Sequence, residues 1–146
     1  MNPMLKKIIT LGQSATVAVY RRSNGKFGGS VKGLPVALLT VPGRKTGQPR
    51  TTPVVYFDHN GAYLVCGSAG GMKQDPQWFK NLAAAKHAQM RIGADTHEVS
   101  ARVAEDPERE QLFAEITTRA PFFADYQRKA GGRVLPVAVL TPTKPV

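Results

Sequence analysis

Cysteine, acidic residues and long hydrophobic runs are scarce in this sequence. The single cysteine, Cys66, excludes an internal disulfide and fits a reducing compartment. The longest apolar runs reach about seven residues, whereas a membrane-spanning helix needs roughly 20. The sequence has only 10 Asp and Glu residues but 20 Lys and Arg residues, so the formal charge is +10 and an anionic partner is expected. The composition otherwise resembles one globular domain over residues 1–146, with 42% hydrophobic and 21% charged residues.

The positive charge is concentrated at the start of the chain. Residues 1–60 hold nine basic residues and one acid, Asp58, whereas residues 61–146 hold eleven basic and nine acidic residues. An anion site is therefore expected mainly in the first 60 residues, with plain solubility as the alternative. A helix is predicted over about residues 3–20 because Leu5, Ile8 and Ile9 fall at helical spacing. It could cover the fold, line an entrance or contact anionic lipid.

Hydrophobic patterning predicts an α+β fold that is mainly β. Paired turn signals between the apolar runs favour antiparallel hairpins, which we expect to close as a small barrel of about six strands flanked by helices. No GxGxxG motif follows the first strand, so a doubly wound fold is excluded. The strands are expected at residues 34–41, 51–57, 62–68, 89–92, 97–103 and 134–141, and helices are expected to begin at Asp75-Pro76, Asp106-Pro107 and Pro121.

A basic turn lies between the first two expected strands, over residues 42–50. Its two glycines allow a tight turn whose amides converge, and Arg44, Lys45 and Arg50 add three positive charges. Arginine binds phosphate through paired hydrogen bonds and lysine acts as a point charge. The turn therefore predicts a polyanion site, with a solvated basic hairpin as the alternative.

A second stretch, residues 66–82, combines small residues with an aromatic helix. Glycine and alanine at a strand end allow a flat ring to approach the backbone closely. Trp78 and Asn81, three residues apart on the following helix, could supply a wall and a polar contact. Core packing is the alternative for Trp78.

Hydrolytic and metal chemistry have little support in the sequence. His59, His87 and His97 have no partners at metal-ligand spacing, so no metal site is predicted. Neither GxSxG nor a Walker loop occurs, and Cys66 in mid-strand is best interpreted as a buried, inert thiol.

The two stretches together resemble the deazaflavin-dependent nitroreductase and quinone reductase family. These are small split β-barrel proteins that use reduced coenzyme F420, an 8-hydroxy-5-deazaflavin. The resemblance covers nearly the whole chain from about Phe27, and the block GRKTGQPR at residues 43–50 with the downstream WxxNL carries most of it. GSAGG at residues 67–71, ADYQ at residues 124–127 and LPV at residues 135–137 also match.

This resemblance implies where the cofactor binds. The phosphate and acidic tail would lie along the basic turn, and the deazaflavin ring would lie beside the strand after the turn, the glycine-containing loop and the aromatic helix. The implied cofactor-binding residues are Arg44, Lys45, Thr46, Arg50, Thr51, Thr52, Pro53, Val54, Val55, Cys66, Gly67, Ser68, Ala69, Gln77, Trp78, Phe79, Lys80 and Asn81.

The resemblance also implies an acceptor site, with departures from the family pattern. Nitroimidazole-reducing relatives carry further tyrosines where this chain has Ala120 and Phe123, and a lysine is common at the position of Ala69. An apolar pocket from Ala120, Phe122, Phe123 and Tyr126 would suit quinones or enones better. Ser68 is expected to hydrogen bond the ring or acceptor, and Tyr126 to donate a proton or clamp the substrate, unless water replaces it.

The sequence therefore predicts an oxidoreductase that passes hydride from reduced coenzyme F420 to a conjugated, lipophilic small molecule. An FMN-binding split-barrel oxidoreductase is the first alternative, and a basic nucleic-acid-binding module is the second. The second is disfavoured because no aromatic-studded strands accompany the basic turn. A cytoplasmic location is expected, with peripheral membrane contact through the N-terminal helix left open. The oligomeric state is not specified by the sequence.

Overall fold

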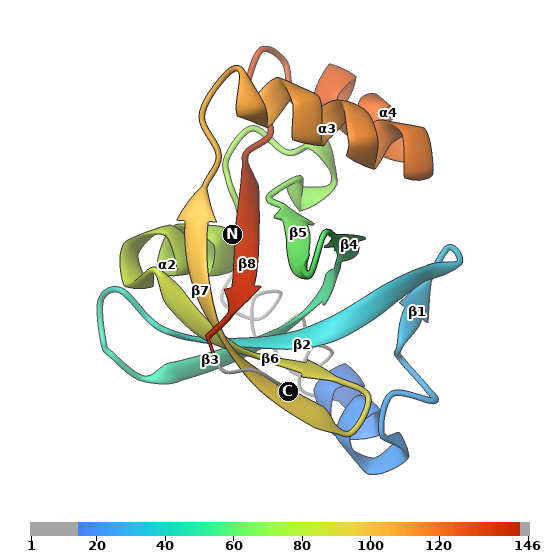
Figure 1. The fold of residues 1–146 in the computed structure, drawn as a ribbon, viewed down its shortest axis with the longest axis vertical. Helices are drawn as coiled ribbons and strands as arrows, with labels where there is room; N and C mark the ends of the chain where they lie inside the picture. Colours follow the sequence, from blue (N-terminus) through green and yellow to red (C-terminus); the bar gives the residue numbers. More distant parts are fainter. Residues whose placement is uncertain (1–14, 144–146) are drawn as a thin grey trace, which may run out of the picture.

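The computed structural model describes residues 15–143, which form one curled sheet flanked by helices (Figure 1). A helix over residues 15–23 comes first. The later elements are β1 (Ser30–Val31), β2 (Leu34–Pro42), β3 (Pro49–Val55), β4 (Phe57–His59), β5 (Ala62–Cys66), the 3₁₀ helix η1 (Ala69–Gly71), α2 (Gln77–Ala85), β6 (His87–Ile92), β7 (Asp95–Val103), α3 (Glu108–Arg119), α4 (Phe122–Lys129) and β8 (Val137–Pro142). The part of the expected N-terminal helix before residue 15 lies outside the described residues.

Every strand pairing in the described sheet is antiparallel. The order is β1-β2-β6-β7-β8-β5-β4, and β3 pairs with β2 beside this path. The expectation of a mainly antiparallel barrel with flanking helices is confirmed. There are eight strands in the described region rather than about six, because the two-residue strand β1 was not expected and the expected strand over residues 51–57 is divided between β3 and β4.

The strand β2 is apolar throughout because both of its faces are covered. Ala37, Leu39 and Val41 point into the curl of the sheet and join the main core. The alternate residues Val36 and Leu38 pack on the outer side against the helix over residues 15–23. Strands buried on both faces lose the polar alternation of a half-exposed sheet, which explains the continuous apolar run.

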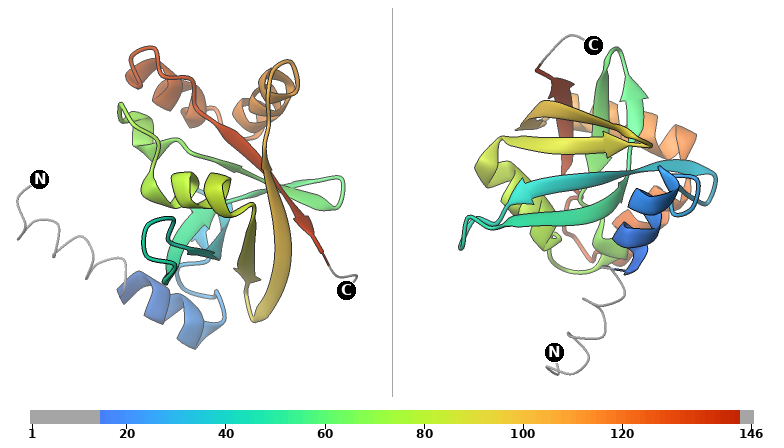
Figure 2. Two further views of the ribbon diagram at one scale, coloured as in Figure 1. Left: turned by 90° about the vertical axis from the view of Figure 1, so that its left-hand side faces the viewer. Right: turned by 90° about the horizontal axis from the view of Figure 1, so that it is seen from below.

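The helices α3 and α4 cover a second core on the outer face of β5 and β8. Leu64 and Cys66 of β5 share this face with residues of β8, and Ile116 of α3 and Phe123 of α4 close it. Figures 1 and 2 show both helices gathered at one end of the sheet, away from the helix over residues 15–23. None of the helices within residues 15–143 has the length and apolar character needed to cross a membrane.

Two helix starts differ from the sequence prediction by one residue. Asp75 and Asp106 were expected as N-caps, whereas Pro76 and Pro107 hold those positions and neither helix has a side-chain cap. The Asp75 carboxylate forms an ion pair with Arg133 instead. A full positive charge from another part of the fold has therefore taken the carboxylate that would otherwise bind local amides.

Candidate active site

The basic turn between β2 and β3 is closed by its own backbone. The Gly43 amide donates to the Gln48 carbonyl over 2.8 Å, and the Gly47 amide donates to the Gly43 carbonyl over 2.8 Å. Gly47 has a φ of +74°, which L-residues other than glycine adopt only at a cost. The Thr46 hydroxyl accepts the Gln48 amide at 3.2 Å. The turn is thus a defined hairpin loop before any ligand is considered.

Arg44 is exposed, but its hydrogen bonds join this turn to α2. Its backbone amide and its Nη1 both donate to Oδ1 of Asn81, over 3.1 and 2.8 Å, and its Nη2 donates to Oε1 of Gln77 over 2.8 Å. Asn81 is only 7% exposed. These three residues, all expected to contact the cofactor, therefore contact one another and fix the turn against the helix.

Lys45 and Arg50 are the two cations of the turn that remain available. Both residues are exposed, and neither side chain makes a hydrogen bond or ion pair to another residue in the range 15–143. Their freedom matters because a ligand anion can be bound without first breaking an internal contact.

The expected cofactor residues of β3 divide between two faces of the strand. Arg50, Thr52 and Val54 pair with the inward residues of β2, so they share the face that holds α2 and the main core. The intervening side chains must point the other way because strands alternate with a period of two. The residues on that outer face are Thr51, Pro53 and Val55.

The Thr51 hydroxyl is already engaged on the outer face. It lies 2.8 Å from the hydroxyl of Thr40 and accepts from Nη2 of Arg21 over 3.4 Å. The side chains of Thr51, Pro53 and Val55 therefore cannot line a pocket beside Trp78, and only their backbone could face such a ligand. Since β3 pairs with β2 alone in the described sheet, its second edge is available for backbone contacts.

The loop over residues 67–75 runs from the end of β5 to α2. Ser68 precedes η1 and is half-buried, and its hydroxyl makes no hydrogen bond to any residue that the structure describes. Ala69 has a φ of +48° and Gly71 a φ of +85°. A Cβ at Gly71 would lie 2.9 Å from the Tyr126 carbonyl oxygen, so loop and α4 are packed too closely for any side chain there.

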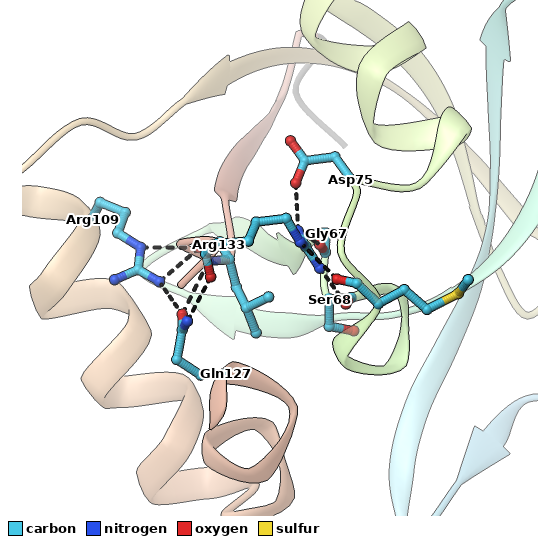
Figure 3. Close-up of polar contacts among 8 residues, drawn as sticks. Gly67, Ser68, Asp75, Arg109, Gln127 and Arg133 are labelled. Carbon is cyan, nitrogen blue, oxygen red and sulfur yellow. Dashed lines mark hydrogen bonds and ion pairs between the residues drawn. The ribbon is translucent and has the colours of Figure 1, made fainter. Parts of the chain in front are cut away.

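A second arginine anchors this loop. Arg133 donates to the carbonyl oxygens of Gly67, Ser68 and Met72 over 2.7–3.0 Å and forms an ion pair with Asp75 (Figure 3). Nothing in the local sequence around position 133 marks this role. Its partners lie 58 or more residues before it in the sequence, so only the fold shows that they meet.

Several other expected site residues have their side chains in the core. Cys66 and Phe79 are 6% and 3% exposed, so only their backbone could meet a ligand. Burial raises the pKa of the Cys66 thiol to about 12, which agrees with an inert cysteine. Trp78 and Lys80 are half-buried on α2, and both keep exposed surface beside the loop.

The four expected acceptor residues separate in the same way. Ala120 and Phe123 are 2% and 5% exposed and belong to the second core, whereas Phe122 and Tyr126 retain exposed surface. The rings of Phe122 and Tyr126 meet edge to face with centroids 5.6 Å apart. Of the four, these two are therefore the ones that an acceptor can reach.

Lys32 is a further residue at this place that sequence reasoning missed. It lies at the tip of the β1–β2 hairpin, with its Nζ 4.4 Å from the Phe122 ring centroid and 3.4 Å from the Tyr126 hydroxyl. Lys32 adopts a positive φ of 51° in this turn. Gly33 beside it is a turn signal in the sequence, but nothing in the sequence points to α4.

The fold and the site together define a split-barrel reductase with a basic turn and a small-residue loop on either side of one helix. The F420H2-dependent quinone reductase family model matches residues 13–142, and this chain belongs to that family. An F420H2-dependent quinone reductase from Mycobacterium tuberculosis is 35% identical over 128 residues, which are 85% of each chain. The expected family, enzyme class and cofactor are thereby confirmed.

Solved structures agree with the assignment. A structure of an F420H2-dependent reductase, FDR-A, superposes with a TM-score of 0.65 and 31% identity, over 73% of this chain and 93% of that one. Another structure, described as a domain-swapped dimer, superposes with a TM-score of 0.68 and 27% identity, over 90% of this chain and 98% of that one.

Proposed function

We propose that this protein passes hydride from F420H2 to a quinone or another flat, electron-poor acceptor at the exposed faces of Phe122 and Tyr126. The observation that carries the proposal is the continuity of the parts. Arg44 joins the basic turn to α2, the loop over residues 67–75 leads directly into α2, and Gly71 packs on α4 at Tyr126. The basic turn with Lys45 and Arg50 is therefore connected through α2 and the loop to the exposed aromatic surface of Phe122 and Tyr126 on α4.

The residues present suit a deazaflavin with an acidic tail. Lys45 and Arg50 offer unpaired positive charge for a phosphodiester and carboxylates. Trp78 gives a partly exposed ring face, and the free Ser68 hydroxyl gives a donor and acceptor. When bound, the reduced cofactor supplies the hydride, and the chain has no need of a nucleophile.

The chain's own part in the reaction is to orient the two reactants and manage one proton. Hydride addition leaves negative charge on the acceptor oxygen, so a donor or cation nearby lowers the barrier. The Tyr126 hydroxyl and the Lys32 ammonium lie 3.4 Å apart at the proposed acceptor surface, where either could donate a hydrogen bond to that oxygen. Water can replace Tyr126 as the proton donor because this face is open.

Steady-state assays with purified protein test the proposal. We expect oxidation of F420H2 with menadione or cyclohexenone, and much slower turnover of a bicyclic nitroimidazole, because the reachable surface is mainly aromatic and the Tyr126 hydroxyl and the Lys32 ammonium are the donors described on it. Reduced FMN serves as the cofactor control. A protein that purifies with stoichiometric FMN, or that oxidises F420H2 no faster with menadione than without it, would refute the proposal.

The same proposal gives the enzyme a cytoplasmic location with contact to anionic membrane surface through its N-terminal segment. The support is chemical: a lipophilic acceptor partitions into lipid, and Lys6 and Lys7 precede the helix that covers β2. Co-sedimentation with anionic and with neutral vesicles checks it, and equal recovery with both would argue against electrostatic contact.

A further inference from the structure

The guanidinium of Arg133 is almost fully used by one loop. Nε donates to the Met72 carbonyl over 2.9 Å, Nη1 to the Gly67 carbonyl over 3.0 Å and Nη2 to the Ser68 carbonyl over 2.7 Å. Nη1 also pairs with the Asp75 carboxylate, and the side chain is only 13% exposed. The planar fork therefore contacts four residues between positions 67 and 75 at once.

Apart from Gly71, which packs closely on α4, the loop has few other restraints. Its backbone bonds are those of the Gly67 amide to the Pro136 carbonyl, the Gly71 amide to the Ser68 carbonyl and the Met72 amide to the Ala69 carbonyl, at 2.9, 2.9 and 3.2 Å. Met72, Lys73 and Gln74 are exposed, so no apolar side chain from the middle of the loop enters a core. A segment with so little burial opens easily unless something else holds it.

The backbone around Arg133 is held in place by side chains of α3 and α4. Gln127 of α4 donates to the Arg133 carbonyl over 2.6 Å and accepts the Leu135 amide over 3.0 Å. Arg109 of α3 donates to the Leu135 carbonyl through Nε and Nη2 over 3.0 and 2.7 Å. Figure 3 shows these groups as one connected network from α3 and α4 to the loop.

We propose that Arg133 is a positioning residue that sets the backbone of residues 67–72 and ties it to α4, so that the Ser68 hydroxyl and the aromatic acceptor surface keep one geometry. This rests on the proposed function, in which that loop lies against the deazaflavin. Arg133 does not face the ligand, because its donors are taken by the loop. Its effect on binding must therefore pass through the loop and not through direct charge attraction.

Arg133→Ala tests this against Arg91→Ala, a matched control. Arg91 is also a partly buried arginine that donates to backbone carbonyls, those of Gly93 and Arg21 at 2.9 and 3.1 Å, but it belongs to β6 and contacts no part of the loop. The readouts are amide hydrogen exchange over residues 67–75, and the F420 dissociation constant from deazaflavin fluorescence at low and high salt.

For Arg133→Ala we expect exchange at the Gly67, Gly71 and Met72 amides to rise at least tenfold and F420 affinity to fall about tenfold or more. The salt dependence of the affinity should stay that of the wild type, because no ligand charge has lost its partner. Arg91→Ala should change neither readout. Unaltered loop exchange, unaltered affinity or a reduced salt dependence would each overturn the proposal.

Arg133→Lys keeps the test decisive if the alanine variant fails to fold. Lysine retains the charge but loses the fork, so intermediate exchange and affinity are expected. Wild-type values for both would show that a point charge suffices and would overturn a positioning role. If wild-type protein does not bind F420, the proposed function fails, whereas the exchange data still decide whether Arg133 holds the loop.

Discussion

The basic turn over residues 42–50 and the loop over residues 67–75 are both glycine-containing connections beside α2, and they use arginine in opposite ways. In the turn, the Arg44 side chain forms hydrogen bonds to α2, while the side chains of Lys45 and Arg50 remain available to a ligand. In the loop, the anchoring charge comes from Arg133, far away in the sequence. The difference predicts that binding at the turn depends on charge and salt, and that binding at the loop depends on shape.

The largest expected difference between the loop and the basic turn is in the unfolding free energy lost when a glycine in each is changed to alanine. Gly71→Ala should cost about 3 kcal/mol of unfolding free energy, because a positive φ is strained and a Cβ there would lie 2.7 Å from the Lys129 Cβ. Gly47→Ala should cost about 1 kcal/mol, since its φ is +74° but no atom lies within 4 Å of the added Cβ. Urea denaturation of both variants measures the difference, and equal losses would contradict it.

The second expected effect is on cofactor affinity at the turn. Lys45→Ala and Arg50→Ala should each weaken F420 binding by about 1.5–3 kcal/mol, the size of a hydrogen bond to a charged group. The loss should shrink as salt is added, because exposed charges are screened. Lys26→Ala, another exposed cation outside the turn, is the control for a general effect of net charge. Titrations that match the wild type in both turn variants would remove the turn from the site.

The sequence was sufficient for the parts of the molecule that local pattern determines. The strand at β2 and the basic turn that follows it were both expected, since turn chemistry and strand period are local properties. The same local signals could not show that Arg44 points to Gln77 and Asn81, because an arginine in a basic turn looks alike whether it faces a ligand or a helix.

The features that the sequence could not show come from contacts between distant segments. Asp75 was expected to cap α2, but Arg133 takes its carboxylate. Ala120 and Phe123 were expected in the acceptor pocket, and the packing of α4 on β5 and β8 buries them. Similarly, only the β2–β3 register shows that Thr51 and Thr52 face opposite sides. Composition and spacing cannot supply these facts, because each depends on which elements meet.

The buried edge of the loop gives a third, smaller test. Cys66 ends β5, and burial raises the pKa of its thiol to about 12 from an ordinary value of 9.0. Below pH 9 both states keep the proton; above it the unfolded chain ionises first, so wild type loses stability as the pH rises toward 12. Relative to Cys66→Ala, we expect a loss of about 1 kcal/mol between pH 8 and pH 10. A pH-independent difference in urea stability would show that the thiol is not buried as described.

The smallest expected effect concerns the acceptor end, where the hairpin tip meets α4. Lys32 is exposed and its ammonium lies 4.4 Å from the centroid of Phe122, so its charge is screened but close to the reachable ring. Lys32→Met removes the charge and keeps an unbranched side chain that is one atom shorter. We expect kcat/KM for a sulfonated naphthoquinone to fall about two- to fivefold, with menadione changed less, because only the first acceptor carries a negative charge to the site.

Lys26→Met controls for overall charge, and the ratio of the two acceptors cancels any change in F420 affinity. The preference should also decline with added salt in the wild type and stay flat in Lys32→Met. If both acceptors lose activity equally and neither loss depends on salt, Lys32 does not act by attracting a charged acceptor, and the acceptor end would then depend on the arrangement of Lys32, Phe122 and Tyr126, as the loop depends on shape.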